Sequence, residues 1–157
     1  MTLAALLSTV LRGFVSGIWG VIAMAGISFT VRRFVEPGVP LGKFHYESVV
    51  EAAHNAVTPE SRTLEEIDRI RLGEIAHLGF GGFWGIVFAL LTRGRVVRPL
   101  LMGTTAGTAV WLGAFAGYMP RLKLSPALWH MRPYGVFRTW ISHVVFAVAT
   151  FLALRRR

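Results

Sequence analysis

The chain of 157 residues has no cysteine, and only 16% of its residues are charged. Without cysteine it can form no disulfide, thiolate metal site or cysteine nucleophile. A soluble domain carries about 25% charged residues, whereas 54% of this chain is hydrophobic, so too little polar sequence remains to cover a soluble core. The composition also excludes a disordered chain and favours a protein embedded in a lipid bilayer.

Acidic residues are also scarce, since 8 Asp and Glu stand against 17 Lys and Arg and give a formal net charge of +9. A nucleic-acid-binding protein gathers such an excess into a basic stripe interleaved with exposed aromatic residues. Here the arginines lie in short groups beside apolar runs, as at Arg93, Arg95 and Arg98 and at 155–157. This placement is typical of the ends of membrane helices, so the expected partner is the lipid bilayer and not a nucleic acid.

Four apolar runs are long enough to cross a membrane, because about 20 residues of α-helix make about 30 Å, the thickness of the hydrocarbon layer. The predicted spans are 13–31, 72–92, 99–119 and 134–154. Before the first span, leucines and valines at helical spacing over 2–11 predict a short amphipathic helix in the interface. The expected fold class is an all-α integral membrane four-helix bundle, with residues 1–157 forming a single membrane domain.

The polar loop over 32–71 separates the first two spans. Pro37 and Pro40 interrupt helix near its start, and helical spacing of apolar residues predicts a short helix after them. Thr63 and Glu66 then form a capping box that predicts the start of a further helix, which runs into the second span. The loop is therefore expected to be helical and to lie outside the membrane.

Four spans place both termini and the loop at 93–98 on one side of the membrane. That side carries seven of the 17 basic residues and no acid, whereas the other side carries the remaining ten together with all 8 acids. A raw count of Lys and Arg favours the second side as cytoplasmic. We nevertheless expect the termini in the cytoplasm, because the short loop and the C-terminus concentrate arginines directly at membrane ends.

Small residues spaced four apart occur in every predicted span. In lipid, helices associate by close packing, which small residues permit. The pairs predicted to pack are Gly13 with Gly17, Gly81 with Gly85, Gly103 with Gly107, and Gly113 with Gly117. These pairs indicate packing within the chain or a homodimer seam, since the spacing alone does not separate the two.

His77 and His143 are the ionisable residues expected within the apolar layer. Such a residue is costly in lipid and points to a partner, a ligand or a proton role, or to a neutral histidine hydrogen-bonded to a neighbouring helix. Residue counts from the outer and inner ends of the spans place the two imidazoles about 9 or about 6 Å apart in depth. We therefore expect no haem held between them.

A doubled E-x-x-H pattern, at Glu51 with His54 and at Glu74 with His77, is the second feature with chemical content. Two such pairs with two further glutamates build a di-metal site, and Glu47 supplies one of these. The last two spans contain no acid, so the fourth carboxylate is missing. The alternative is an acidic surface on the loop, with Glu74 forming an ion pair with Arg138. No cofactor is predicted, and a metal ion remains the alternative.

No motif of an enzyme is present, since the chain lacks G-x-S-x-G, HExxH and a glycine-rich phosphate loop after a strand. We therefore expect no catalytic residues. An oligomeric transporter or channel subunit remains an alternative, although four helices would have to oligomerise to enclose a path.

Three segments of the second half resemble the YagU-like family of small bacterial inner-membrane proteins. They run from His77 to Gly85, from Gly113 to Pro120 and from Trp140 to Phe146, and the resemblance covers about the last 85 residues. It implies a multi-pass protein of the bacterial cytoplasmic membrane. One branch of the family is associated with acid resistance, which implies a role in the envelope.

Two hypotheses of different classes follow. The first is a non-enzymatic accessory or scaffold protein in envelope homeostasis under acid stress, which acts alone, as a homo-oligomer or with a partner in a membrane complex. The second is a membrane protein that binds a metal or cofactor through the E-x-x-H pairs.

Overall fold

The computed structural model describes residues 2–34 and 66–155. In that part the chain is all-α, with long helices α1 (Leu3–Phe34), α3 (Glu66–Leu91), α4 (Pro99–Leu112) and α6 (Pro133–Arg155). After α4 the chain continues through a π-helix, η1 (Gly113–Tyr118), and a short α-helical turn, α5 (Met119–Arg121), and a 3₁₀ turn, η2 (Leu128–His130), precedes α6. The expected all-α class is confirmed.

Within residues 2–34 and 66–155, four segments are long and apolar enough to cross a membrane: Leu3–Val31, Ile70–Leu91, Pro99–Arg121 and Pro133–Arg155. They agree with the predicted spans, apart from the first, within a few residues at each end. The chain is therefore a multi-pass membrane protein in contact with the lipid bilayer. The continuation of the loop helix into the second span is also confirmed, because α3 is one helix from Glu66.

The prediction of a short, separate amphipathic helix over residues 2–11 is wrong. α1 is a single helix of 32 residues, which at about 1.5 Å per residue is about 48 Å long and exceeds the hydrocarbon layer. No proline occurs before Pro37, and Gly13, where the separation was expected, is helical and buried. A single glycine costs a helix only about 1 kcal/mol, so it does not end one.

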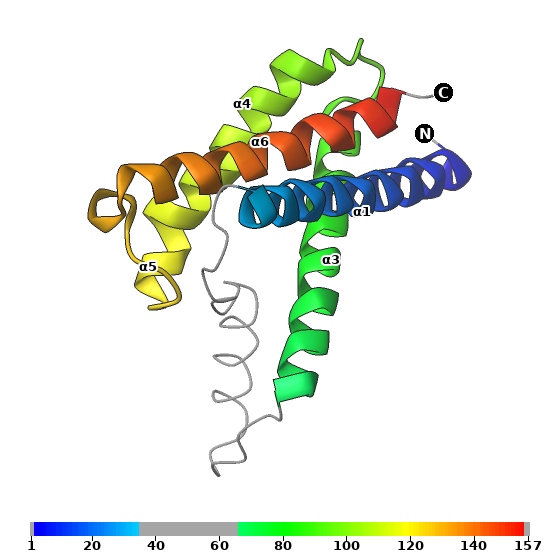
Figure 1. Cartoon of the computed structure of the whole chain (residues 1–157). Coiled ribbons are helices and arrows are strands. Elements are labelled where there is room, and N and C mark those ends of the chain that lie inside the picture. Colours follow the sequence, from blue (N-terminus) through cyan, green and yellow to red (C-terminus); the bar gives the residue numbers. More distant parts are fainter. Residues whose placement is uncertain (1, 35–65, 156–157) are drawn as a thin grey trace.

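The four long helices pack in the order α3, α1, α6, α4 (Figure 1). α1 packs against both α3 and α6, and α6 packs against α4, whereas α3 touches α6 at few points and is not paired with α4. α3 and α4 are therefore the outer helices of the described bundle, and α1 and α6 form its centre. The main core cluster lies among all four and includes Val21, Phe88, Phe146 and Phe151.

The N- and C-terminal parts of the chain meet at one end of the bundle (Figure 1). Nη2 of Arg12 donates a hydrogen bond to the carbonyl oxygen of Leu154, 3.1 Å away, which pairs a cation with the C-terminal carbonyls of α6. Thr92 and Arg95 of the turn between α3 and α4 line the same cleft as these two residues. We call this region, formed by residues 9–20, 81–97, 103–107 and 147–155, the terminal end.

Glycines lie at close helix crossings of the terminal end, between α1 and α3 and between α4 and α6. A Cβ atom built on Gly13 would come within 2.7 Å of Cα of Ile86, and one on Gly85 would meet the backbone of Gly13 and Gly17. Between α4 and α6, a Cβ on Gly103 would lie 2.6 Å from Cα of Val148. Real Cβ contacts are never this short, so these crossings exist only because the residues are glycine.

Gly17, Gly81 and Gly107 are at the same crossings, since a Cβ on each would meet atoms of the facing helix. Gly113 and Gly117 differ from the other predicted packing glycines. A Cβ on Gly113 would meet nothing within 4 Å, and one on Gly117 only its own Arg121 at 3.9 Å. Both lie in the π-helix η1, so their spacing does not produce a helix crossing.

Candidate functional site: a histidine-lined pocket

Beyond the glycine crossings the helices separate around a pocket of about 250 Å³. Its walls come from all four long helices together with η1 and α5. The lining residues are Val21, Met24, Ala76, His77, Phe80, Gly81, Val110, Ala114, Phe115, Tyr118, Met119, His143 and Phe146. We call this the histidine pocket, and its location is the pocket end of the bundle.

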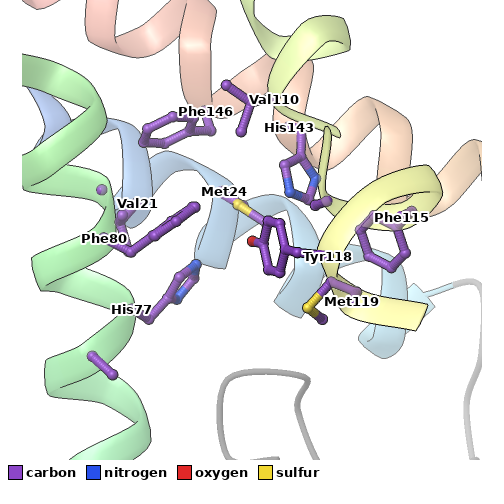
Figure 2. Close-up of a pocket in the computed structure, with 13 residues that line it drawn as sticks. Val21, Met24, His77, Phe80, Val110, Phe115, Tyr118, Met119, His143 and Phe146 are labelled. Atoms are coloured by element: carbon purple, nitrogen blue, oxygen red, sulfur yellow. The ribbon is translucent and has the colours of Figure 1, made fainter. Parts of the chain in front are cut away.

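Among the described residues, three polar side chains line the histidine pocket, and each comes from a different element. Figure 2 shows His77 on α3 and His143 on α6 pointing into the space from two sides, with Tyr118 of η1 between them. All three belong to segments long and apolar enough to span the membrane. The pocket therefore brings together polar side chains of a kind that is rare in membrane-spanning segments, because such groups are costly to place in lipid.

Tyr118 faces the pocket because the helix widens before it reaches the loop. Pro120 has no amide hydrogen, and its ring crowds the carbonyl group of Ala116 one turn earlier. The backbone relieves this conflict by forming the π-helical turn over Gly113–Tyr118, and such turns are frequent at functional sites. The amide of Met119 then donates to the carbonyl of Ala114.

The imidazole of His143 is held in a defined orientation. Nδ1 lies 2.7 Å from the carbonyl oxygen of Thr139, one turn earlier in α6. The edge of the ring meets Phe115 at a centroid distance of 5.8 Å and an interplanar angle of 86°. Phe115 is itself buried, so this side of the pocket is preformed.

His77 and His143 line one pocket, which the residue counts did not predict, and the expectation that no haem is held between them stays a prediction. The residue counts assumed four upright helices of equal depth. In the fold α1 and α3 cross at Gly17 and Gly81, and the helices run obliquely to one another (Figure 1). Positions at different counts from the helix ends can therefore line the same pocket.

The E-x-x-H pairs remain a prediction. Glu47, Glu51 and His54 lie outside the described residues, and Glu74 is exposed one turn before His77. Among residues 2–34 and 66–155, no group of three His, Asp or Glu side chains could hold a metal ion. The ion pair between Glu74 and Arg138 also stays a prediction.

Sequence reasoning missed Tyr118 and Met24 as parts of the site. Tyr118 carries a hydroxyl inside a predicted span, two residues before a proline, and that combination is the signal that could have identified it. Met24 carries no such signal, since a methionine in an apolar helix is most often a packing residue. Only the crossing of α1 with α3 and α6 brings it to the pocket.

Comparison of the chain with protein-family models, with curated proteins and with solved structures finds no match.

Proposed function

We propose that the chain is a non-enzymatic accessory protein of the bacterial cytoplasmic membrane, and that its histidine pocket holds a small molecule taken up from the lipid phase. Its termini face the cytoplasm, a side chosen from the arginines of the short loop and the C-terminus. Its role is in envelope homeostasis, as the resemblance to the YagU-like family implies. The observation that carries the proposal is the pocket itself, with three polar side chains inside segments that can span a membrane.

The volume of the pocket supports the binding of a small molecule more than a scaffold role. An engineered cavity of about 150 Å³ is large enough to hold benzene, and this pocket measures about 250 Å³. Protein interiors are otherwise packed with few voids larger than a water molecule. A pocket of this kind is typical of proteins that bind a small molecule, and a purely structural helical bundle does not require one.

The test is to dissolve a small phenyl-diazirine photolabel in the bilayer around the reconstituted protein and to map the labelled residues. Phe115 and Val110 line the pocket but are only 3% and 6% exposed. Lipid alone therefore labels them weakly, and strong labelling at both reports a probe inside the pocket.

Two residues calibrate this measurement. Leu100 is 73% exposed and should be labelled from the lipid, whereas Ala147 is 0% exposed, does not line the pocket and should stay unlabelled. We expect Phe115 and Val110 to be labelled like Leu100. Labelling of both at the level of Ala147 would show that the pocket takes up no molecule from the bilayer and would contradict the proposal.

A further inference from the structure

A second cavity lies at the terminal end of the bundle, in the cleft where Arg12 bonds to Leu154. Its volume is about 130 Å³, and the described residues that line it are different from those of the histidine pocket. Arg12 of α1 lines it together with Arg93 and Arg95 of the turn between α3 and α4. We call it the arginine cleft, because it brings cationic side chains from distant parts of the sequence around one space.

The segments that form the arginine cleft contain no acidic residue. All 8 Asp and Glu lie within residues 36–74. The last of them, Glu74, precedes the final residue of α3, Leu91, by 17 positions, which is about 26 Å of helix. The arginines repel one another in this space, and α1, α6 and the turn after α3 supply no carboxylate side chain to balance them.

Arg12 is fixed in the cleft by one hydrogen bond and has donors to spare. It belongs to an apolar helix, where a charged side chain is costly unless it reaches a partner or the membrane surface. Its Nη2 donates to the carbonyl oxygen of Leu154, 3.1 Å away. A guanidinium group carries several N–H donors in a planar fork, so a second partner can bind the rest.

Arg95 is positioned by the turn that follows α3. Gly94 has a φ of 71°, in the left-handed region that glycine adopts readily, and the amide of Arg95 donates to the carbonyl oxygen of Thr92 at 3.0 Å. The guanidinium group of Arg95 has no hydrogen bond or ion pair within residues 2–34 and 66–155. Arg93 is already engaged, so the donors of the cleft are those of Arg12 and Arg95.

Neutralisation of helix ends accounts for only part of this positive charge. α3 and α6 both end beside the cleft, and a helix C-terminus carries about half a negative charge. The two ends together therefore offset about one unit of charge, whereas Arg12 and Arg95 carry one positive charge each. About one positive charge remains, which matches the single negative charge of a phosphodiester.

The arginine cleft lies where three of the spans end. The segments that can cross the membrane end at Leu91 and Arg155 and begin again at Pro99, so the turn between them lies at the boundary of the hydrocarbon layer, beside the lipid head groups. The three arginines that line the cleft are exposed, so it can be reached from the membrane surface.

The size and the walls of the cleft suit a small head group. An engineered cavity of about 150 Å³ holds benzene, and a phosphate group is smaller than benzene, so a volume of about 130 Å³ is sufficient. Ala89, Val97 and Leu154 form an apolar part of the wall. The cleft therefore joins cationic donors to an apolar surface, as the junction of a phospholipid head group with its acyl chains requires.

We propose that the arginine cleft binds the phosphate group of an anionic phospholipid, with the guanidinium groups of Arg12 and Arg95 donating hydrogen bonds to its oxygens. Guanidinium groups match phosphate with paired N–H donors, and basic pockets between membrane helices hold lipid head groups in this way. A free phosphate ion has the same chemistry, so the experiment separates the two sources. This site is additional to the histidine pocket and does not depend on it.

The experiment measures binding of tritiated dioctanoyl-phosphatidylglycerol to the immobilised full chain in neutral detergent micelles, with three unlabelled competitors. Dioctanoylglycerol has the same acyl chains without the phosphate, and inorganic phosphate has the anion without the chains. We expect unlabelled dioctanoyl-phosphatidylglycerol to compete at a concentration at least about tenfold lower than dioctanoylglycerol, because hydrogen bonds to charged groups are the strong ones. Inorganic phosphate should not displace the lipid over the same range of concentrations, because it lacks the apolar contacts.

Arg95→Gln is the main variant, because Arg95 is exposed and its side chain is not needed for the fold. It should weaken lipid binding by about tenfold, and Arg95→Lys, which keeps the charge but loses the fork, should fall between it and the unchanged protein. Arg98→Gln is the matched control. It removes the same charge from the same loop but outside the cleft, and should weaken binding by less than about twofold, since exposed charges are screened by salt.

Equal competition by dioctanoylglycerol and dioctanoyl-phosphatidylglycerol would overturn the proposal, because the chain would not recognise the phosphate. Equal weakening in Arg95→Gln and Arg98→Gln would also overturn it, since binding would then come from a diffuse positive surface and not from the cleft. Displacement by inorganic phosphate over the same concentrations would show that the lipid is the wrong source.

Discussion

The terminal end and the pocket end are built from the same four helices, yet one is closed and the other is hollow. At the terminal end, glycines bring α1 to α3 and α4 to α6 so closely that a Cβ atom would overlap the facing backbone. At the pocket end the same helices carry aromatic, histidine and methionine side chains around a space of about 250 Å³. The difference teaches that side-chain size along a helix sets where neighbouring helices touch and where they part.

The transition occurs within one or two turns of each helix. On α1, Gly17 lies at the crossing with α3, and Val21 and Met24 already line the pocket. On α4, Gly107 meets the backbone of α6, and Val110 of α4 and Ala114 of η1 follow in the pocket wall. The helices thus touch at the glycine crossing, and the bulkier residues beyond it hold them apart.

The largest expected difference is in the signal of topology reporters fused to the two ends of the bundle, because we expect these ends to lie on opposite sides of the membrane. Reporter fusions after Thr92 and Arg157 should give the cytoplasmic signal, because Thr92 belongs to the terminal end and Arg157 follows its last residue, Arg155, by two positions in the sequence. Fusions after Arg33 and Arg121 should give the opposite signal. A shared signal at Arg33 and Thr92 would mean that the chain does not cross the bilayer between the two ends.

A large side chain at a glycine crossing should destabilise the fold strongly. In Gly107→Leu even the first added carbon would lie 2.8 Å from Cα of Val144, and overpacking costs about 1 to 3 kcal/mol, occasionally more. Unfolding in detergent measures the loss. Gly113→Leu is the matched control, since a Cβ there meets nothing within 4 Å, and similar losses in the two variants would show that the crossing is not tight.

A smaller effect is expected from two hydrogen bonds that link α4 to α6. Nε1 of Trp111 donates to Oγ1 of Thr139 at 3.0 Å, and Nε1 of Trp140 donates to Oγ1 of Thr108 at 2.9 Å. Each Trp→Phe change should lower the free energy of unfolding by about 0.6 to 1.7 kcal/mol, as hydrogen bonds between membrane helices do.

Trp84→Phe is the control for these tryptophan variants. Nε1 of Trp84 is buried and has no partner among the described residues, so removing it deletes no hydrogen bond. We expect no loss beyond the smaller ring. A loss as large as that of the Trp111 variant would show that ring size, and not the hydrogen bonds, stabilises this pair of helices.

The four spans could be predicted from sequence because each is a long apolar run bounded by charge or proline. Six of the eight glycines singled out for packing lie at helix crossings, but their spacing could not tell them from Gly113 and Gly117. The latter two lie in a π-helical turn that depends on Pro120. Local spacing indicates which residues can pack closely, and the tertiary fold decides which of them do.

The histidine pocket could be predicted only in part. His77 and His143 stood out as ionisable residues in apolar runs, but their meeting depends on the oblique crossing of the helices, which residue counts do not contain. Tyr118 and Met24 come from η1 and α1, far from either histidine in the sequence. The site is a product of helix packing, and no single segment carries its pattern.

The most direct test of the account compares the free energy of unfolding of Gly17→Ala and Ala76→Leu in the same lipid nanodiscs. Alanine is the better helix former by about 1 kcal/mol, so propensity alone would make Gly17→Ala stabilising. The account predicts the reverse, a loss of about 2 kcal/mol or more, because the new Cβ would overlap the backbone of Gly81. Ala76→Leu adds more atoms but directs them into the pocket, and should change stability by less than about 1 kcal/mol. An equal or larger loss in Ala76→Leu than in Gly17→Ala would contradict the division into a closed and a hollow end.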